Sequence, residues 1–299
     1  MPVLQVLTPV LDGSEAACEI WLGNSNLAHG QCGAIRYRYD DEMLFGVIAL
    51  AEAGHASAEV PPLQQAAESA YRQILTLLDD LNYPFMYRYW NYMADINGVS
   101  HGLERYRQFN LGRQEAFLAC GRGVDGELPA ACALGTTHGP LTIAFLVGRT
   151  PALAIENPRQ VSAYQYPEQY GPRSPTFARA SLLRLPQVEM LFISGTASIV
   201  GHETQHQADV IAQTCETLAN LQAVIAEANR LASKPEFNLK DVLFRVYLRY
   251  AADMPLIRKE MERMIGAPVK AVFLQADICR EDLLVEIEIT AGHAFERIS

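Results

Sequence analysis

One order of secondary structure is predicted twice along this chain of 299 residues. The order is strand, helix, strand, helix, strand, strand, and in the first half it covers residues 43–50, 62–82, 85–93, 103–119, 130–135 and 141–148. The second half repeats it at residues 188–198, 205–232, 242–250, 255–266, 269–278 and 283–289. The segments YRYWNYMADI and FRVYLRYAADM hold the same place in the two halves and are similar in sequence. This long period is typical of a duplicated domain, so we predict an α+β protein built from two halves of one fold.

The spacing of apolar residues supports the individual elements. Residues 205–232 carry apolar side chains at gaps of three and four, which predicts one long helix. Between residues 242 and 250, Val242, Phe244, Val246 and Leu248 alternate with other residues, which predicts a strand with one buried face.

Residues 151–180 differ from the rest of the chain. They are rich in proline and tyrosine and show neither helical nor strand periodicity. A loop this long in a compact protein is more often functional than not. We therefore predict an N-terminal half at 1–150, a connecting loop at 151–180 and a C-terminal half at 181–299, with the active site in the cleft between the halves.

Charge and composition limit the classes of function. The net charge is −10 with no basic run, which argues against a nucleic-acid or membrane surface. A small anionic substrate would need arginines gathered locally against this overall field. The start of the chain resembles no secretory signal, no segment has the roughly 20 apolar residues of a membrane span, and the six cysteines form no CxxC. We expect reduced thiols and a cytoplasmic protein.

Two glutamates on an apolar strand raise a question about function. Glu286 and Glu288 lie two residues apart in LLVEIEI and so share one face of the predicted strand. Either that face contacts water, or one of the two carboxyls is an acid held in a pocket.

A formal zinc-protease pattern, HExxH, occurs at residues 202–206. It requires both histidines on one helical turn, but the glycine-rich turn before it places His202 ahead of the helix. Glu227, the candidate third ligand, would lie roughly 31 Å from His206 along a continuous helix. We therefore predict no metal site here.

Other candidate residues have ordinary explanations as well as functional ones. Cys279 could be a nucleophile, but a lone cysteine is usually a small apolar filler. Arg113 in NLGRQEAF is expected at the surface on sequence alone. Arg173 and Arg179 are six residues apart in a proline-fixed loop and could bind a carboxylate, and this alternative stays open.

The second half resembles the RidA/YjgF proteins, which have a chorismate-mutase-like β-α-β fold. The likeness rests on FISGTASIVG, QTCETLANLQAVIAEA and the closing VEIEI, over about residues 188–290. RidA deaminases carry an arginine on the penultimate strand, whereas this chain reads VKAVFLQ there. An imine hydrolase or a metabolite-binding protein is the alternative function that this resemblance implies.

A closer resemblance, to the chorismatases, covers nearly the whole chain. It rests on YRYWNYMADIN, GRQEAF, SAYQYPEQYGPRSPTFARAS, FISGTASIVGHET and QADICREDLLVEIE, in this order. Chorismatases release pyruvate from chorismate on a RidA-like fold, and this chain looks most like the bifunctional type that makes 3-hydroxybenzoate and 4-hydroxybenzoate. The resemblance implies Glu286 as the catalytic acid and Cys279 as a pocket residue. It implies substrate binding by Arg113, Tyr170, Arg173, Arg179 and Ala197.

The implied reaction needs an acid that is still protonated near neutral pH. Protonation of the enol ether at its methylene carbon forms an oxocarbenium-like centre, and burial on an apolar strand would raise the pKa of Glu286 enough to supply that proton. We expect no metal or redox cofactor, a structural role for Glu288, and a monomer or a trimer. A zinc hydrolase remains an alternative that metal analysis would test.

Overall fold

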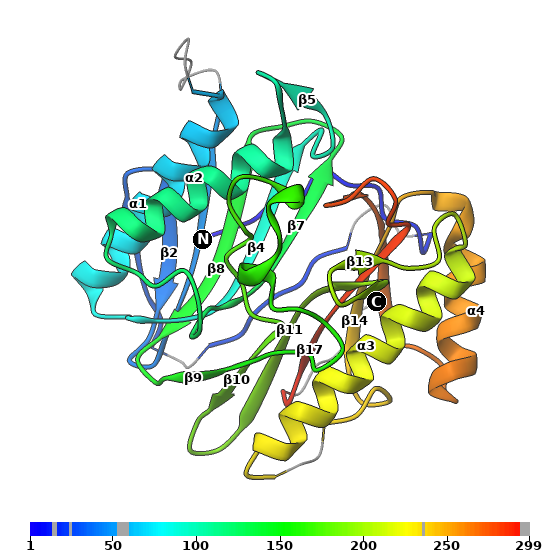
Figure 1. The fold of residues 1–299 in the computed structure, drawn as a ribbon. Coiled ribbons are helices and arrows are strands. Elements are labelled where there is room, and N and C mark those ends of the chain that lie inside the picture. Colours follow the sequence, from blue (N-terminus) through cyan, green and yellow to red (C-terminus); the bar gives the residue numbers. More distant parts are fainter. Residues whose placement is uncertain (14–16, 24–25, 53–59, 235–236, 294–299) are drawn as a thin grey trace.

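The computed structural model describes residues 1–13, 17–23, 26–52, 60–234 and 237–293. Two β-sheets lie face to face, and a pair of helices covers the outer face of each (Figure 1). The helices are α1 (Pro62–Leu81) and α2 (Arg105–Ala119) on the first sheet, and α3 (Val210–Leu231) and α4 (Met254–Ile265) on the second. Three hydrophobic clusters fill the spaces between these four layers.

The first sheet has seven strands in the order β1-β2-β3-β8-β4-β7-β16. Their bounds are β1 Ala28–Cys32, β2 Ile35–Tyr39, β3 Met43–Leu50, β8 Leu141–Gly148, β4 Phe85–Ala94, β7 Ala130–Thr136 and β16 Asp277–Ile278. β16 comes from the C-terminal half of the chain, so it joins the two halves through backbone hydrogen bonds to β7.

The second sheet has six strands in the order β15-β14-β17-β11-β10-β9. Their bounds are β15 Ala271–Gln275, β14 Leu243–Leu248, β17 Val285–Ala291, β11 Glu189–Ala197, β10 Ala180–Arg184 and β9 Ala152–Ile155. Read from its other end, this order matches β1-β2-β3-β8-β4-β7 strand for strand. The one parallel pair also recurs, as β4 with β7 and as β14 with β15. The predicted α+β class and the repeat of one fold are confirmed.

Both faces of the central strands are buried. Phe244, Val246 and Leu248 of β14 pack under the helices, as the alternation predicts. The other face of β14 was expected in water, yet Tyr247 on that face is fully buried against the first sheet. The prediction of a single buried face was wrong because the first sheet takes the place of solvent on the other face.

The long helix of the second half is shorter than predicted. α3 begins at Val210 instead of residue 205, and the Asp209 side chain caps it by accepting a hydrogen bond from the Ala212 amide at 3.0 Å. Residues before the cap form the short ribbon of β12 (Ile199–Val200) and β13 (Glu203–Thr204).

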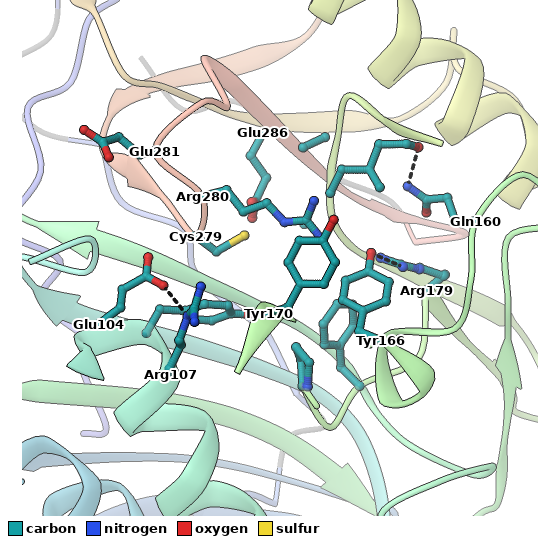
Figure 2. Close-up of a pocket in the computed structure, with 16 residues that line it drawn as sticks. Glu104, Arg107, Gln160, Tyr166, Tyr170, Arg179, Cys279, Arg280, Glu281 and Glu286 are labelled. Atoms are coloured by element: carbon teal, nitrogen blue, oxygen red, sulfur yellow. Dashed lines mark hydrogen bonds and ion pairs between the residues drawn. The ribbon is translucent and has the colours of Figure 1, made fainter. Parts of the chain in front are cut away.

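The proline- and tyrosine-rich segment contains more regular structure than its sequence indicates. β9 lies within it, and β10 begins at its end; neither strand was predicted, because both are short and not clearly alternating. Between them are the 3₁₀ turns η2 (Ala163–Gln165) and η3 (Glu168–Tyr170). Tyr166 and Tyr170 of this stretch lie beside Arg280 (Figure 2). The division at residues 150 and 180 stays a prediction.

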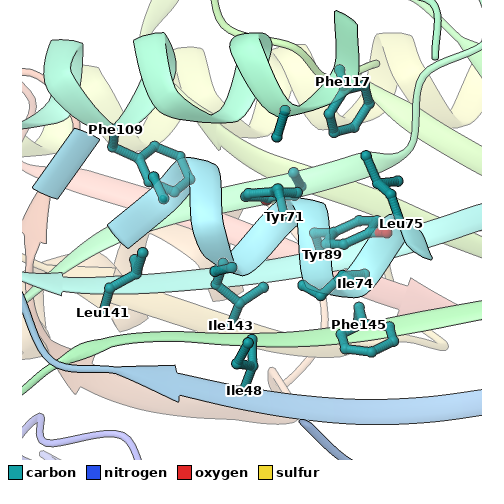
Figure 3. Packing of buried hydrophobic residues seen from close by; sticks show 14 of the residues in the cluster. Ile48, Tyr71, Ile74, Leu75, Tyr89, Phe109, Phe117, Leu141, Ile143 and Phe145 are labelled. Carbon is teal, nitrogen blue, oxygen red and sulfur yellow. The ribbon is translucent and has the colours of Figure 1, made fainter. Parts of the chain in front are cut away.

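Tyr71 of α1 lies at the centre of the first core (Figure 3). Its ring contacts Tyr89, Phe109 and Phe117 at centroid distances of 5.5, 6.2 and 5.8 Å. Its hydroxyl donates to Asn91 Oδ1 at 2.6 Å, so the buried phenol is satisfied. α1, α2 and β4 are thereby fixed to one another.

We expect Gly112→Ala to lower the free energy of unfolding by about 2 kcal/mol, since overpacking typically costs about 1–3 kcal/mol. A Cβ at Gly112 of α2 would lie 2.1 Å from the backbone oxygen of Gln64 in α1. The measurement is urea unfolding, with Gly123→Ala as control, because a Cβ there makes only an ordinary contact at 3.6 Å. Equal stability of Gly112→Ala and wild type would contradict this close helix contact.

Candidate active site

A cavity lies where segments from both halves of the chain meet (Figure 2). The N-terminal half contributes Tyr106, from the first turn of α2. The connecting segment contributes Tyr166 and Tyr170, and the C-terminal half contributes residues of β11, β17 and the turn after β16. The predicted location of the site between the halves agrees with this geometry.

Glu286 of β17 lies in the wall of this cavity and is only 4% exposed. Burial and the nearby charge of Glu288 together raise the pKa of its carboxyl to about 8, while Arg88 opposes the shift. The carboxyl fits because residue 195 on the neighbouring strand is glycine: a Cβ there would lie 1.9 Å from Glu286 Oε1. The side chain is therefore a carboxylic acid that keeps its proton at neutral pH.

Glu288, two residues along the same strand, has the opposite protonation state. It forms ion pairs with Arg88 and Arg245 and accepts a hydrogen bond from the Tyr247 hydroxyl at 3.2 Å. Burial alone would raise its pKa, but the two guanidinium groups hold the pKa below its usual value. The face of β17 that carries both glutamates is buried, so the alternative of a strand face open to solvent is wrong.

Cys279 lies beside Glu286 in the cavity. Burial and the neighbouring Glu286 raise the pKa of its thiol to about 12. A thiol with this pKa is protonated at neutral pH, and it lacks the thiolate character of a cysteine nucleophile. Cys279 therefore lines the cavity as a small uncharged side chain.

Two arginines present unpaired donors near the cavity. Arg179 donates from Nη2 to the Val161 carbonyl and the Tyr166 hydroxyl, both at 2.8 Å. Arg280 stacks 4.0 Å from the Tyr170 ring centroid and donates to the His202 carbonyl at 2.9 Å. Arg179 Nε and Arg280 Nη2 are buried and have no partner among the described residues. A buried unpaired donor is costly, so these two N–H groups indicate a site for an anion.

Comparison with known proteins places the chain in a family. Residues 19–147 match the family model described as Chorismatase FkbO/Hyg5-like, N-terminal. A 3-hydroxybenzoate synthase of Streptomyces hygroscopicus is 36% identical over 92% of this chain and 81% of its own length. A chorismatase of the same organism is 38% identical over 92% of this chain and 79% of its own. This chain belongs to the chorismatase family.

A solved structure supports the same assignment for the whole fold. The crystal structure of a chorismatase superposes with a TM-score of 0.80 at 37% sequence identity. The match covers 88% of this chain and 78% of the other. The chain therefore has the fold of that chorismatase over most of its length.

Most of the residues that the family resemblance implied lie in the cavity. Glu286, Cys279, Tyr170, Arg179 and Ala197 all line it. The family resemblance thus identified five residues of one cavity, although they lie up to 116 positions apart in the sequence.

Two of the implied residues are placed elsewhere and are not among the described residues that line the cavity. Arg113 is 2% exposed within the first half, where its Nη2 donates to Asn110 Oδ1 at 3.0 Å and its guanidinium packs on the Phe109 ring. The expectation of a surface position for it was wrong, because this face of α2 packs inward. Arg173 is exposed.

Several cavity residues were missed in the sequence. Four residues that line the cavity were not among the predicted site residues: Arg280, Tyr106, Tyr166 and Arg107. Arg280 could have been found, since it directly follows Cys279 in a segment already assigned to the pocket. Tyr106 and Arg107 could not, because only the packing of α2 brings them there.

The HExxH pattern does not have the geometry of a zinc site. β13 occupies Glu203–Thr204 and the helix begins only at Val210, so His202 and His206 do not share a helical turn. His202 Nδ1 lies 3.2 Å from the Tyr170 hydroxyl, and His206 pairs with Glu216. Among the described residues, no three metal-ligating side chains are grouped.

Every described helix is too short or too polar to cross a bilayer.

We expect Glu286→Gln to be more stable than wild type by on the order of 3 kcal/mol at neutral pH, a value that follows from the shifted pKa. The acid is neutral when folded up to about pH 8 but ionises in the unfolded chain near its ordinary value, so wild-type stability falls as pH rises between these values. The Glu286→Gln variant does not lose stability in this way, because its amide does not ionise. Urea unfolding of both proteins across pH tests this, and the difference should vanish near pH 4. A difference that is independent of pH would refute a raised pKa.

Proposed function

We propose that this protein releases pyruvate from chorismate and gives 3-hydroxybenzoate and 4-hydroxybenzoate. The observation that carries the proposal is a buried carboxylic acid, Glu286, whose pKa is raised to about 8 inside a cavity that three arginines line. Membership of the chorismatase family supports the reaction, and one relative is named a 3-hydroxybenzoate synthase. The proposal unites the acid, the cationic groups and the aromatic walls of one cavity.

Glu286 acts as a general acid in this proposal. It donates its proton to the methylene carbon of the enol ether, and the electron pair of that double bond forms the new C–H bond. The adjacent ether carbon becomes an oxocarbenium-like centre, which the new Glu286 carboxylate stabilises electrostatically. The bond between the ring carbon and the ether oxygen then breaks, and its electron pair forms the carbonyl of the released pyruvate. Whether the neighbouring ring hydroxyl closes onto the electron-poor carbon determines which isomer forms. Loss of one ring proton restores the aromatic ring, and the Glu286 carboxylate takes up that proton, so no net water is consumed.

Arg179 and Arg280 are the groups that we assign to the substrate carboxylates. Chorismate carries two carboxylates, and each arginine has one buried N–H without a partner among the described residues. Tyr166 orients Arg179 through a hydrogen bond of 2.8 Å, and Tyr170 stacks on Arg280. Local guanidinium groups thus attract a dianion to a protein whose net charge is −10. Ala197 and the neutral Cys279 border the space for the ring.

Glu286→Gln should lose at least about a hundredfold in pyruvate release, because a general acid typically contributes 10²–10⁴-fold. The amide keeps the shape of the side chain but cannot supply the proton. The experiment mixes each protein with chorismate, follows pyruvate, and identifies the aromatic products. Glu281→Gln is the matched control, since Glu281 is an exposed carboxyl at the same cavity and should stay within a few-fold of wild type. Near-normal turnover by Glu286→Gln would exclude it as the acid.

Arg179→Lys and Arg280→Lys should each lower kcat/KM for chorismate by roughly thirtyfold, because a lost charge-assisted hydrogen bond costs about 2 kcal/mol. Lysine keeps the charge but loses the planar fork of donors. Arg173→Lys is the control: it is exposed outside the cavity, and its kinetics should match wild type. A larger loss in Arg173→Lys than in the other two would show that the connecting segment moves onto the substrate.

A further inference from the structure

Glu288 is the only glutamate in the described structure that is held by arginines from both halves of the fold. Arg88 comes from β4, and Arg245 comes from β14, the strand in the same position of the second sheet. The two arginines also occupy matching places in the related segments YRYWNYM and FRVYLRY. The buried carboxylate of Glu288 thus pairs with two arginines that occupy equivalent positions in the two halves of the fold.

The remaining contacts of this cluster balance its charge. Arg245 also pairs with Glu19, so two carboxylates face two guanidinium groups. Both guanidinium groups lie near the ring of Trp90, at 5.3 Å from its centroid for Arg88 and 5.9 Å for Arg245. Tyr247 donates to Glu288 and shares a hydrogen bond of 2.8 Å with Tyr92. Glu288 is therefore fixed as an anion in a dry environment.

The acid of the cavity is the nearest carboxyl on the same face of the same strand. Glu286 and Glu288 are two residues apart on β17, so their Cα atoms are separated by roughly 7 Å. The other charged and titratable groups around Glu286 come from every neighbouring element: Arg88, Cys132, Tyr106, Tyr247, Arg179, Cys279 and Arg280. Arg88 is the cation among them that acts directly on Glu286. Its pairing with Glu288 decides whether it also stabilises a Glu286 anion.

We propose that Glu288 is a positioning residue for the reaction, which holds Arg88 away from Glu286 and keeps Glu286 protonated by its own fixed negative charge. This inference rests on the proposed role of Glu286 as the acid. Two physical effects act together. The anion of Glu288 repels a second negative charge on the strand, and it occupies the guanidinium that would otherwise pair with Glu286.

The first half of the fold has different residues at the positions equivalent to Glu286 and Glu288. The strand register places Glu286 opposite Tyr247 and Glu288 opposite Arg245. The matching partners in the first sheet are Ala144 opposite Trp90 and Leu146 opposite Arg88. Both glutamates are thus replaced by apolar residues in the half that lacks the acid, which is consistent with the two carboxyls working as a pair.

Substitutions at the two ends of the ion pair should move the pH dependence in opposite directions. Glu288→Gln removes the repelling charge and releases Arg88, so the alkaline limb of kcat/KM for pyruvate release should move down by about one pH unit or more. Arg88→Met removes the cation that favours ionised Glu286, so the limb should move up. Loss of packing alone would lower activity at every pH and would not move the alkaline limbs of the two variants in opposite directions.

The double variant Arg88→Met/Glu288→Gln guards against unfolding of a single variant. It leaves no unpaired buried charge at this pair, because Arg245 keeps Glu19, and its limb should lie between those of the two single variants. Limbs that coincide in all four proteins, or that shift in one direction for both single variants, would overturn the proposal.

A second readout separates this inference from the proposed function. The carboxyl carbon of Glu286 can be titrated by ¹³C NMR in the ligand-free protein, with the signal assigned by its absence in Glu286→Gln. Opposite shifts of this titration in Glu288→Gln and Arg88→Met would support the inference even if chorismate gave no pyruvate. An unchanged titration together with normal pyruvate release would refute the inference and leave the proposed function standing.

Discussion

The buried ion cluster around Glu288 is the interaction on which the arrangement of this protein depends. Burial of a charge between two sheets costs several kcal/mol unless a partner is in contact. Glu288 meets that condition only because β4 of one half and β14 of the other both supply an arginine. The two sheets must therefore face each other in one register, and any slip would leave a charge unpaired in the interior.

The same register creates the active site. With Glu288 fixed, the alternation of β17 places Glu286 on the same dry face, beside the cavity that both halves border. One strand thus carries two carboxyls in opposite protonation states, one raised in pKa by burial and one lowered by guanidinium groups. Paired carboxyls with different environments are a general way to divide acid and electrostatic roles. The duplicated fold contains a single such pair because the first half has Ala144 and Leu146 at the matching places.

The interface also explains the aromatic run of β4. Tyr87, Trp90 and Tyr92 fill the space between the sheets, and Tyr92 meets Tyr247 of the other half through a hydroxyl pair at 2.8 Å. These side chains are large, apolar over most of their surface and polar at one end. They can therefore pack two sheets and still satisfy the few polar groups there. Tyr89, the fourth aromatic residue of this run, packs in the first core instead.

The sequence by itself determined the duplicated α+β order and the main helices and strands, because hydrophobic spacing follows from which face of each element is buried. It also indicated Glu286, since a carboxyl on an apolar strand needs a special environment, and family motifs added Cys279, Arg179, Tyr170 and Ala197. Only the tertiary structure decided that Arg113 packs inside the first half, that Arg173 stays exposed, and that Arg280 and Tyr106 reach the cavity. Only it showed that Arg88 and Arg245 converge on Glu288, 200 and 43 positions away along the chain. Periodicity is a local property, whereas a charge pair or a cavity depends on which distant segments meet, and that is set by the packing of one sheet on the other.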